Sequence, residues 1–504
     1  MACRCGILHH PSCENHPPFM TQLNSSENRS SPQPDAIDTR SPSIGRNMLS
    51  NRSLWIVVCS ALLVRGAVLS YSNDSLQQDP DAYQAIASTL HTTGTFGLTA
   101  PDGQVIPTAF RPPLYPTVLS TFVNSTGIPD TRLIALLHLL AGLMTAVFCY
   151  GGTRNLLLSH TNDIKTERVS VIAALLVTID PILIQQSSFA MTETIAACIV
   201  SSIYWQWTQQ IKEAPRWKSR FTLGILLCLA YLCRPTFLAW SVLLLGGEIL
   251  WHLVSKKHRT SRLRTKELLK LFLPVVLIAV TVMTWAERNR RATGYPVWAT
   301  THGGYTLLLG NNPLFYRHLE TGGSFQRWDA TDFTRAYAFR FGEDGRTEGF
   351  WLQPRSPDQV PKPPDASLSE HGDDQWSYQA AKATISRAPT TFIQACLNRI
   401  YRLWTPLPFE TSDRTSTKRV IISSYYTLLY IAAAIGMSGM FLGGKPLNLW
   451  PTFSLIAALT IIHAFYWSNL RMRAPAMPLI AICAANAFAW QPKSSSQVQN
   501  VAHT

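Results

Sequence analysis

Long apolar stretches alternate with polar and charged stretches along most of this 504-residue chain. A helix of about 20 residues spans the roughly 30 Å hydrocarbon layer of a bilayer, and many of these stretches are long enough for one. A helix also satisfies its own backbone hydrogen bonds inside that layer. The pattern predicts an all-α polytopic membrane protein with about ten transmembrane helices. We expect them near 53–70, 132–150, 169–185, 190–207, 221–253 (two helices), 268–286, 420–442, 449–467 and 475–490.

The polar stretches divide the chain into segments. Residues 1–50 are rich in Ser, Pro, Asn and Arg and lack apolar periodicity, which is typical of a disordered tail. The further segments are a membrane core at 51–286 with a long first loop at 71–130, a polar loop region at 287–419, C-terminal transmembrane helices at 420–490 and a tail at 491–504. Within the polar region, residues 389–404 are amphipathic, as suits a helix lying in the membrane interface.

The positions of Lys and Arg predict which loops face the cytoplasm. The net charge is +14, and fifteen Lys and Arg lie in the short loops at 152–168, 209–220, 255–270 and 443–447. Only five lie in the opposite loops at 71–132, 180–191, 234–236 and 468–474. The positive-inside rule places the first set in the cytoplasm. We therefore expect an inner (plasma) membrane protein with both chain ends in the cytoplasm, its long loops outside, and no nucleic-acid partner.

The cysteines indicate neither a disulfide framework nor a clear metal site. Most of the ten lie inside apolar stretches, where a free cysteine behaves as a small hydrophobic residue. A separate cluster near the start contains Cys3, Cys5, His9, His10, Cys13 and His16, but its spacing fits no common zinc pattern. No cofactor or metal site is predicted, and the sequence is silent on a divalent metal requirement.

Two motifs stand out in the first long loop, Asp79-Pro-Asp-Ala-Tyr83 and Phe110-Arg-Pro-Pro-Leu-Tyr-Pro116. Asp79 is expected to cap a helix that has Pro80 in its first turn and ends near Gly94. Two carboxylates then lie at the start of a short amphipathic helix. A purely structural interpretation also fits, in which Asp79 is a cap and Asp81 interacts with the helix dipole.

Acids and arginines recur in every turn that is expected to face outward. These residues are Asp79, Asp81, Arg111, Asp180, Glu193, Arg234, Arg471 and Arg473. A carboxylate can act as a general base, and arginine binds phosphate through a fork of donors. Together they predict a cavity at the membrane surface for a substrate with a phosphate leaving group. The alternatives are that Arg471 and Arg473 anchor helix ends among headgroups, that Glu193 is a helix N-terminal charge, and that Arg234 ends a span.

The order of these motifs resembles the GT-C membrane glycosyltransferases. The resemblance rests on Asp79-x-x-x-Tyr83, on Arg111-Pro-Pro-Leu-Tyr-Pro116 and on three later stretches. Those stretches are Asp180-Pro181 through Glu193, Arg288-Asn289 through Gly310-Asn311, and Arg471-x-Arg473-x-Pro475-x-x-Pro478. The most similar group comprises bacterial protein O-mannosyltransferases, aminoarabinose transferases and rhizobial lipopolysaccharide-sugar transferases. The resemblance covers roughly residues 53–490.

The resemblance implies transfer of a sugar from a polyprenyl-phosphate donor to a lipid or protein acceptor on the outer face of the membrane. It implies catalytic roles for Asp79 or Asp81 and for Glu193, with Asp79 preferred for its spacing to Tyr83. Arg111, Arg471 and Arg473 are then expected to bind the donor phosphate. Tyr83, Tyr115, Asp180 and Arg234 are expected to line the substrate cavity.

Two other classes of protein also fit the composition. A secondary transporter is helical and charged, but its site usually lies at the bilayer midplane between internal repeats, and no repeat is visible here. A non-catalytic assembly protein of the cell envelope has no need for acids and phosphate-binding cations on one face.

Overall fold

The structure of the chain is a computed structural model. It describes residues 51–71, 73–158, 163–210, 216–254, 261–355, 359–361, 369–408, 416–443 and 446–489. The predicted tails at 1–50 and 491–504, with the Cys/His cluster, lie outside the described residues.

The described residues are mostly helical, with one small two-stranded sheet. Up to residue 293 the elements are α1 (Asn51–Ser70), α2 (Asn73–Gln77), α3 (Tyr83–Thr93), β1 (Gly97–Thr99), β2 (Val105–Pro107), α4 (Leu114–Ser120), α5 (Thr131–Leu157), α6 (Asp163–Thr178), α7 (Pro181–Ser187), α8 (Glu193–Gln210), α9 (Trp217–Cys233), α10 (Thr236–Val254) and α11 (Ser261–Thr293). The later elements are α12 (Gly303–Gly310), α13 (Pro313–His318), η2 (Leu319–Gly323), α14 (Thr331–Ala338), α15 (Glu348–Leu352), α16 (Glu370–Arg387), α17 (Pro389–Trp404), α18 (Ser416–Leu442), α19 (Pro446–Phe465), η3 (Leu470–Ala476) and α20 (Met477–Asn486).

The long apolar helices confirm the predicted class of all-α multi-pass membrane protein. Among the described residues, six helices are long and apolar enough to cross a bilayer: α1, α5, α10, α11, α18 and α19. The pair α6 and α7 is bent by 52° and forms a seventh span if counted as one. The other expected spans correspond to α8, α9 and α20, which do not pass the same test. The expected number of ten is therefore not confirmed.

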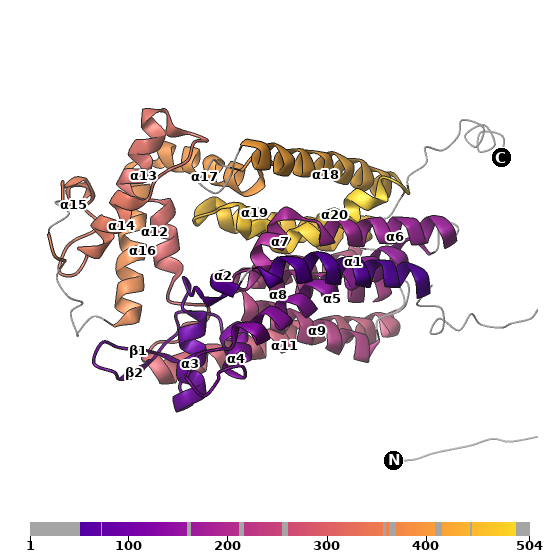
Figure 1. Cartoon of the computed structure of the whole chain (residues 1–504), viewed down its shortest axis with the longest axis horizontal. Helices are drawn as coiled ribbons and strands as arrows, with labels where there is room; N and C mark the ends of the chain where they lie inside the picture. The colour runs from indigo at the N-terminus through magenta and orange to yellow at the C-terminus, as the bar shows by residue number, and fades with distance from the viewer. Residues whose placement is uncertain are drawn as a thin grey trace, which may run out of the picture. The chain divides into compact units, whose positions relative to one another are not determined.

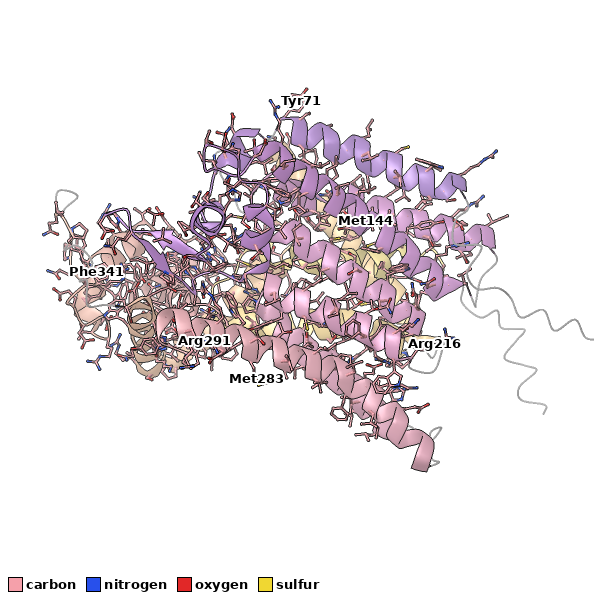
Figure 2. The ribbon with its side chains drawn as sticks, turned by 90° about the horizontal axis from the view of Figure 1, so that it is seen from below. Tyr71, Met144, Arg216, Met283, Arg291 and Phe341 are labelled. Atoms are coloured by element: carbon pink, nitrogen blue, oxygen red, sulfur yellow. The ribbon has the colours of Figure 1, made fainter. Side chains whose placement is uncertain are left out.

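Among the long helices, α5 packs against α1, α6 and α8. α9 packs on α11, α10 on α19, and α18 on α20. The last pair approaches so closely that a Cβ at Gly436 would overlap the backbone carbonyl of Cys483, so only glycine fits there. The short elements α3, β1, β2 and α12 to α16 lie together at one end of the long helices (Figure 1). The labelled Arg216 and Phe341 lie at opposite ends of the molecule (Figure 2).

The break between α6 and α7 is stabilised by a buried arginine. Arg65 on α1 is 2% exposed and donates to the backbone carbonyl of Leu183 at 2.7 Å and to that of Val177 at 3.3 Å. These carbonyls flank the bend, where the helical hydrogen-bond pattern is interrupted. The arginine thus supplies a donor to the Val177 carbonyl, because Pro181 has no N–H to continue the helical hydrogen bonding there.

Residues 303–404 form a compact helical region outside the long helices. α12 packs on α16 around an aromatic core that includes Phe333, Phe350 and Trp351. α17 is amphipathic as predicted, but the two arginines of its last turns, Arg399 and Arg402, are buried. Arg399 donates to the carbonyls of Gly310 and Ala464, so it joins α17 to α12 and α19.

Candidate active site

The first loop begins with a tight turn that separates its two aspartates. The helix was expected to start at Pro80, but α3 starts at Tyr83 because Ala82 adopts a left-handed backbone conformation (φ 57°). Asp79 still interacts with the helix start, since its Oδ2 accepts from the Ala85 N–H at 2.9 Å. The helix ends at Gly94 as predicted, with φ 72° at that glycine. The turn therefore directs Asp79 toward the helix backbone and frees Asp81 for other partners.

Arg111 holds Asp81 through two hydrogen bonds. Its Nε donates to the Asp81 carbonyl at 2.7 Å, and its Nη2 donates to Asp81 Oδ1 at 2.9 Å. The guanidinium also lies over the ring of Phe110 at 4.2 Å and over that of Tyr83 at 5.6 Å. Burial raises the pKa of Tyr83 to about 12, so this phenol stays protonated at neutral pH. Side chains from both motifs of the first loop thus form one connected unit.

Further charges extend this unit into an alternating cluster. Arg471 in η3 places Nη1 3.6 Å from Asp81 Oδ2 and Nε 3.8 Å from Glu193 Oε1. Arg234, between α9 and α10, places Nη1 3.5 Å from the same Glu193 oxygen. That Nη1 is buried and has no hydrogen-bond partner among the described residues. Three arginines surround two carboxylates here, which leaves a surplus of positive charge suited to an anionic ligand.

The charge cluster lines a cavity of about 720 Å³. Its polar end includes Asp81, Arg111, Glu193, Arg234 and Arg471. Its other walls are apolar and come mainly from α10 and α19, through Leu238, Ala239, Val242, Leu243, Ala458, Ile461 and Ile462. Two of these residues, Val242 and Ile461, are 64% and 55% exposed on helices that are apolar enough to span a membrane. The cavity is therefore amphiphilic, and its apolar walls reach the face that lipid covers.

Aromatic residues that the sequence analysis did not identify form a further wall of this cavity. They are Trp298, His302, Tyr378, Tyr466 and Trp467. Burial, together with the charge of Arg111, lowers the pKa of His302 to about 3, so its ring is neutral. Nothing in the spacing of these residues predicts the wall, because they come from separate segments that meet only in the fold.

Four of the residues expected in the site lie outside the residues that line this cavity: Asp79, Tyr115, Asp180 and Arg473. Tyr115 is buried and hydrogen-bonds His138 at 2.9 Å. Asp180 caps α7, accepting from the Leu183 N–H at 2.9 Å and from the Tyr426 hydroxyl at 3.0 Å. Arg473 is fully buried and donates to the carbonyls of Leu403 and Thr405. Each of the four has a structural partner, and their functional roles stay predictions.

A latch joins the first loop to the outer helical region. Glu370, at the start of α16, accepts from the Thr108 hydroxyl, from the Ala109 N–H at 3.1 Å and from the Thr301 hydroxyl. Arg288 adds bonds to the carbonyls of Phe96 and Thr108. These contacts fix the chain just before Arg111.

Among the described residues, no three of His, Cys, Asp and Glu lie close enough together to hold a metal ion.

Part of the chain matches a known family of enzymes. Residues 119–288 match the dolichyl-phosphate-mannose-protein mannosyltransferase family. This match confirms the resemblance to membrane glycosyltransferases that the motifs indicated. The matched segment contains Glu193 and Arg234, whereas Asp81, Arg111 and Arg471 lie outside it. No relative was found among curated protein sequences.

Solved structures also match this chain, all at low sequence identity. The oligosaccharyltransferase AglB from Archaeoglobus fulgidus, in complex with an inhibitory peptide and a dolichol-phosphate, is 14% identical with a TM-score of 0.46; the match covers 87% of this chain and 50% of that one. ArnT from Cupriavidus metallidurans bound to undecaprenyl phosphate is 12% identical with a TM-score of 0.38; the match covers 90% of this chain and 80% of that one. This chain thus spans about half the length of the AglB chains it matches.

Proposed function

We propose that this protein is a glycosyltransferase that moves a sugar from a polyprenyl-phosphate donor to a lipid or protein acceptor. One observation supports this most directly, namely that a single cavity joins an arginine–carboxylate cluster to apolar walls on α10 and α19. A prenyl chain suits the apolar walls, and its phosphate suits the arginines. The family match over 119–288 supports the same class of donor.

In the proposed reaction, Arg234 and Arg471 hold the donor phosphate, and Arg111 fixes Asp81. An acceptor hydroxyl attacks the anomeric carbon of the donor sugar while the bond between that carbon and the phosphate oxygen breaks. Asp81 Oδ2 takes the hydroxyl proton, and polyprenyl phosphate leaves with the bonding electrons and its charge balanced by the arginines. Glu193 acts as a positioning residue, because it lies within 3.8 Å of both Arg234 and Arg471.

We assign the base to Asp81 in preference to Asp79. Asp81 lines the cavity, whereas the carboxylate of Asp79 accepts from the backbone of α3. Burial raises the pKa of Asp79, and the backbone N–H groups at the start of α3 oppose this shift. Asp79 thus satisfies a backbone N–H of the first turn of α3 from a position before its N-cap, Ala82.

We further propose that the site faces the extracytoplasmic side of the inner membrane. The lysines and arginines of the short loops support this orientation. Arg216, in one of these cationic loops, lies at the end opposite to Phe341 of the outer helical region (Figure 2).

The donor class is tested with purified protein in nanodiscs and a membrane extract as source of acceptors. We expect a radiolabelled short-chain polyprenyl-phosphate sugar to transfer its label to the extract and release polyprenyl phosphate. A soluble nucleotide sugar should give no transfer. Transfer from the nucleotide sugar alone contradicts the proposal, and vectorial movement of substrate without bond cleavage would favour a transporter.

A further inference from the structure

A fully buried histidine joins a membrane helix to the first loop. His138 is 0% exposed and lies on α5, which is apolar enough to span a bilayer. An ionisable side chain in such a place is costly and calls for a specific partner. The partner here is Tyr115, from the second motif of the first loop, whose hydroxyl lies 2.9 Å from His138 Nε2. This hydrogen bond therefore connects α4 of the loop to the interior of the bundle.

The other ring nitrogen sets the direction of this hydrogen bond. His138 Nδ1 lies 2.8 Å from the backbone carbonyl oxygen of Ser187, at the end of α7. A carbonyl oxygen only accepts, so Nδ1 carries a proton and donates it to this bond. Burial favours the neutral ring, in which Nε2 is then an acceptor. The hydroxyl of Tyr115 therefore donates to His138, and both ring nitrogens are satisfied.

Tyr115 in turn supports the aromatic ring of Tyr83. The two rings meet edge to face, with centres 5.3 Å apart and an angle of 81° between their planes. Both belong to one cluster of buried apolar residues that includes positions from α1 to α5. The guanidinium of Arg111 lies over the Tyr83 ring and donates to Asp81. A row of touching side chains thus runs from His138 to the proposed catalytic carboxylate.

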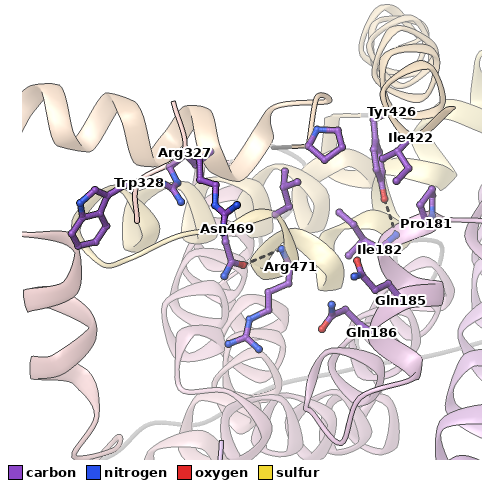
Figure 3. Close-up of a pocket in the computed structure, with 13 residues that line it drawn as sticks. Pro181, Ile182, Gln185, Gln186, Arg327, Trp328, Ile422, Tyr426, Asn469 and Arg471 are labelled. Carbon is purple, nitrogen blue, oxygen red and sulfur yellow. Dashed lines mark hydrogen bonds between the residues drawn. The ribbon is translucent and has the colours of Figure 1, made fainter. Parts of the chain in front are cut away.

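The carbonyl that accepts from His138 belongs to a helix that also contacts the charge cluster. α7 packs against η3, which carries Arg471. Gln185 and Gln186 of α7 line one pocket together with Arg471 (Figure 3). His138 thus bonds to α4, which follows Arg111 in the chain, and to α7, which packs against the element that carries Arg471.

We infer that the hydrogen bond between His138 and Tyr115 positions residues for the proposed transfer reaction. It holds Tyr83 in place, and Tyr83 supports the guanidinium of Arg111, which fixes Asp81. Neither His138 nor Tyr115 lines the cavity, so both act as positioning residues. The inference rests on the proposed function, because it takes Asp81 as the base.

Loss of this bond should affect the rate more than donor binding. The arginines that hold the donor phosphate, Arg234 and Arg471, come from other parts of the chain and keep their contacts with Glu193. The base, in contrast, is held less firmly against the acceptor hydroxyl, and a small displacement of a reacting group is costly. We therefore expect a lower kcat with little change in the KM for the donor.

Three substitutions test the bond in purified protein in nanodiscs, with the lipid-linked sugar as donor. Tyr115→Phe removes only the hydroxyl, and kcat should fall roughly three- to tenfold. His138→Phe removes both hydrogen bonds of the imidazole and should be at least as slow. His138→Gln supplies a donor and an acceptor on one amide and should recover part of the rate. The double variant of Tyr115→Phe and His138→Phe should be no slower than His138→Phe alone, because both changes remove the same bond.

Hydrogen exchange measures the same effect without any activity. Backbone amides of α3, which begins at Tyr83, should exchange at least roughly threefold faster in Tyr115→Phe and His138→Phe than in the wild type. Tyr425→Phe is the matched control, since it also removes one hydroxyl bond, to the Leu176 carbonyl at 2.7 Å, on α18 and outside the first loop. The control should lower Tm to a similar extent and leave both kcat and the exchange of α3 unchanged.

The outcomes separate this inference from the proposed function. Wild-type kcat in both Tyr115→Phe and His138→Phe overturns the inference, whether or not Tm falls. An equal loss of kcat in Tyr425→Phe also overturns it, because the effect then follows stability alone. If the wild type transfers no sugar from the lipid-linked donor, the proposed function fails instead. Faster exchange of α3 in the two variants would then still support the positioning of the first loop by His138, and unchanged exchange would overturn it.

Discussion

Arg471 Nη1 lies 3.6 Å from Asp81 Oδ2, although the two residues are separated by almost four hundred positions in the chain. One comes from the first outer loop and the other from the turn before the last helix. Their contact closes the polar end of the cavity and brings Glu193 and Arg234 into the same cluster. The chemistry of the proposed site therefore depends on the docking of the C-terminal helices against the first loop.

Asp81→Asn should reduce transfer by at least about a hundredfold, because an amide does not take the acceptor proton. The fold should persist, since Asn Oδ1 still accepts from Arg111. Asp79→Asn is the matched control, and it should stay active because Asn caps a helix about as well as Asp. Initial rates of transfer at saturating donor measure both variants. The reverse pattern, with only Asp79→Asn inactive, would return the base to Asp79.

Arg471→Ala and Arg473→Ala should fail in different ways. Removing Arg471 deletes a charge-assisted contact worth about 1.5–3 kcal/mol, which weakens the interaction with the donor roughly ten- to a hundredfold. Arg471→Lys should recover only part of this, since lysine lacks the guanidinium fork. Arg473→Ala removes two bonds to backbone carbonyls inside the protein and should lower stability by roughly 2–4 kcal/mol.

The donor dependence of the rate and the thermal midpoint Tm distinguish these two effects. An increase in the KM for the donor at unchanged Tm identifies a ligand contact, and a lower Tm at unchanged KM identifies a structural one. If Arg471→Ala shows only the second effect, this arginine does not bind phosphate.

The sequence predicts the six longest apolar helices because their apolar runs are long and the bilayer allows little else, whereas the expected spans at α8, α9 and α20 stay unconfirmed. The end of α3 at Gly94 is also predictable, since glycine accepts the left-handed conformation there. The start of α3 is not. Ala82 has no local signal for its left-handed backbone, and this residue decides that Asp81 and not Asp79 lines the cavity.

The different roles of Arg471 and Arg473 are also not predictable from the sequence. Arg471 and Arg473 belong to the same polar turn in the sequence. In the structure they lie in η3, a 3-10 helix with about three residues per turn. Residues two apart in such a helix point in different directions. Arg471 thus faces the cavity, and Arg473 is buried over the rings of Tyr426 and Tyr430. Which arginine contacts a ligand depends on tertiary packing that a single sequence does not encode locally.

The orientation in the membrane is tested by cysteine labelling of intact cells. A cysteine at Asp102, in the turn between β1 and β2, should react with a membrane-impermeant maleimide added outside. A cysteine at Lys218, at the start of α9, should react only after the cells are opened. Both probes are compared with the unmodified protein, which sets the background of its own cysteines. Reaction of the second probe in intact cells would invert the topology and place the site in the cytoplasm.

Asp374 should make the outer helical region more stable in mild acid. Burial raises the pKa of this carboxyl to about 6, although the Gly304 N–H donates to it at 2.6 Å. Between about pH 4 and 6 the unfolded state loses this proton and the folded state keeps it, so this contribution to stability falls as the pH rises. The total amounts to roughly 3 kcal/mol at most. Asp374→Asn should therefore flatten the dependence of Tm on pH, and an unchanged profile would contradict the assignment.

Glu370 should control catalysis from a distance through its bonds to the first loop. Its carboxylate accepts from Thr108, Ala109 and Thr301, and Thr108 and Ala109 immediately precede the Phe110–Arg111 pair. In Glu370→Gln the amide group replaces one acceptor oxygen with a donor, so the bond from a threonine hydroxyl to that oxygen is lost or has to reverse its direction. We expect kcat to fall several-fold, because Arg111 and Asp81 are then held less rigidly, while the KM for the donor changes little. Glu348→Gln, at the start of α15 and outside the latch, is the control. If Glu370→Gln lowers Tm but leaves kcat intact, the latch stabilises the fold without ordering the catalytic loop.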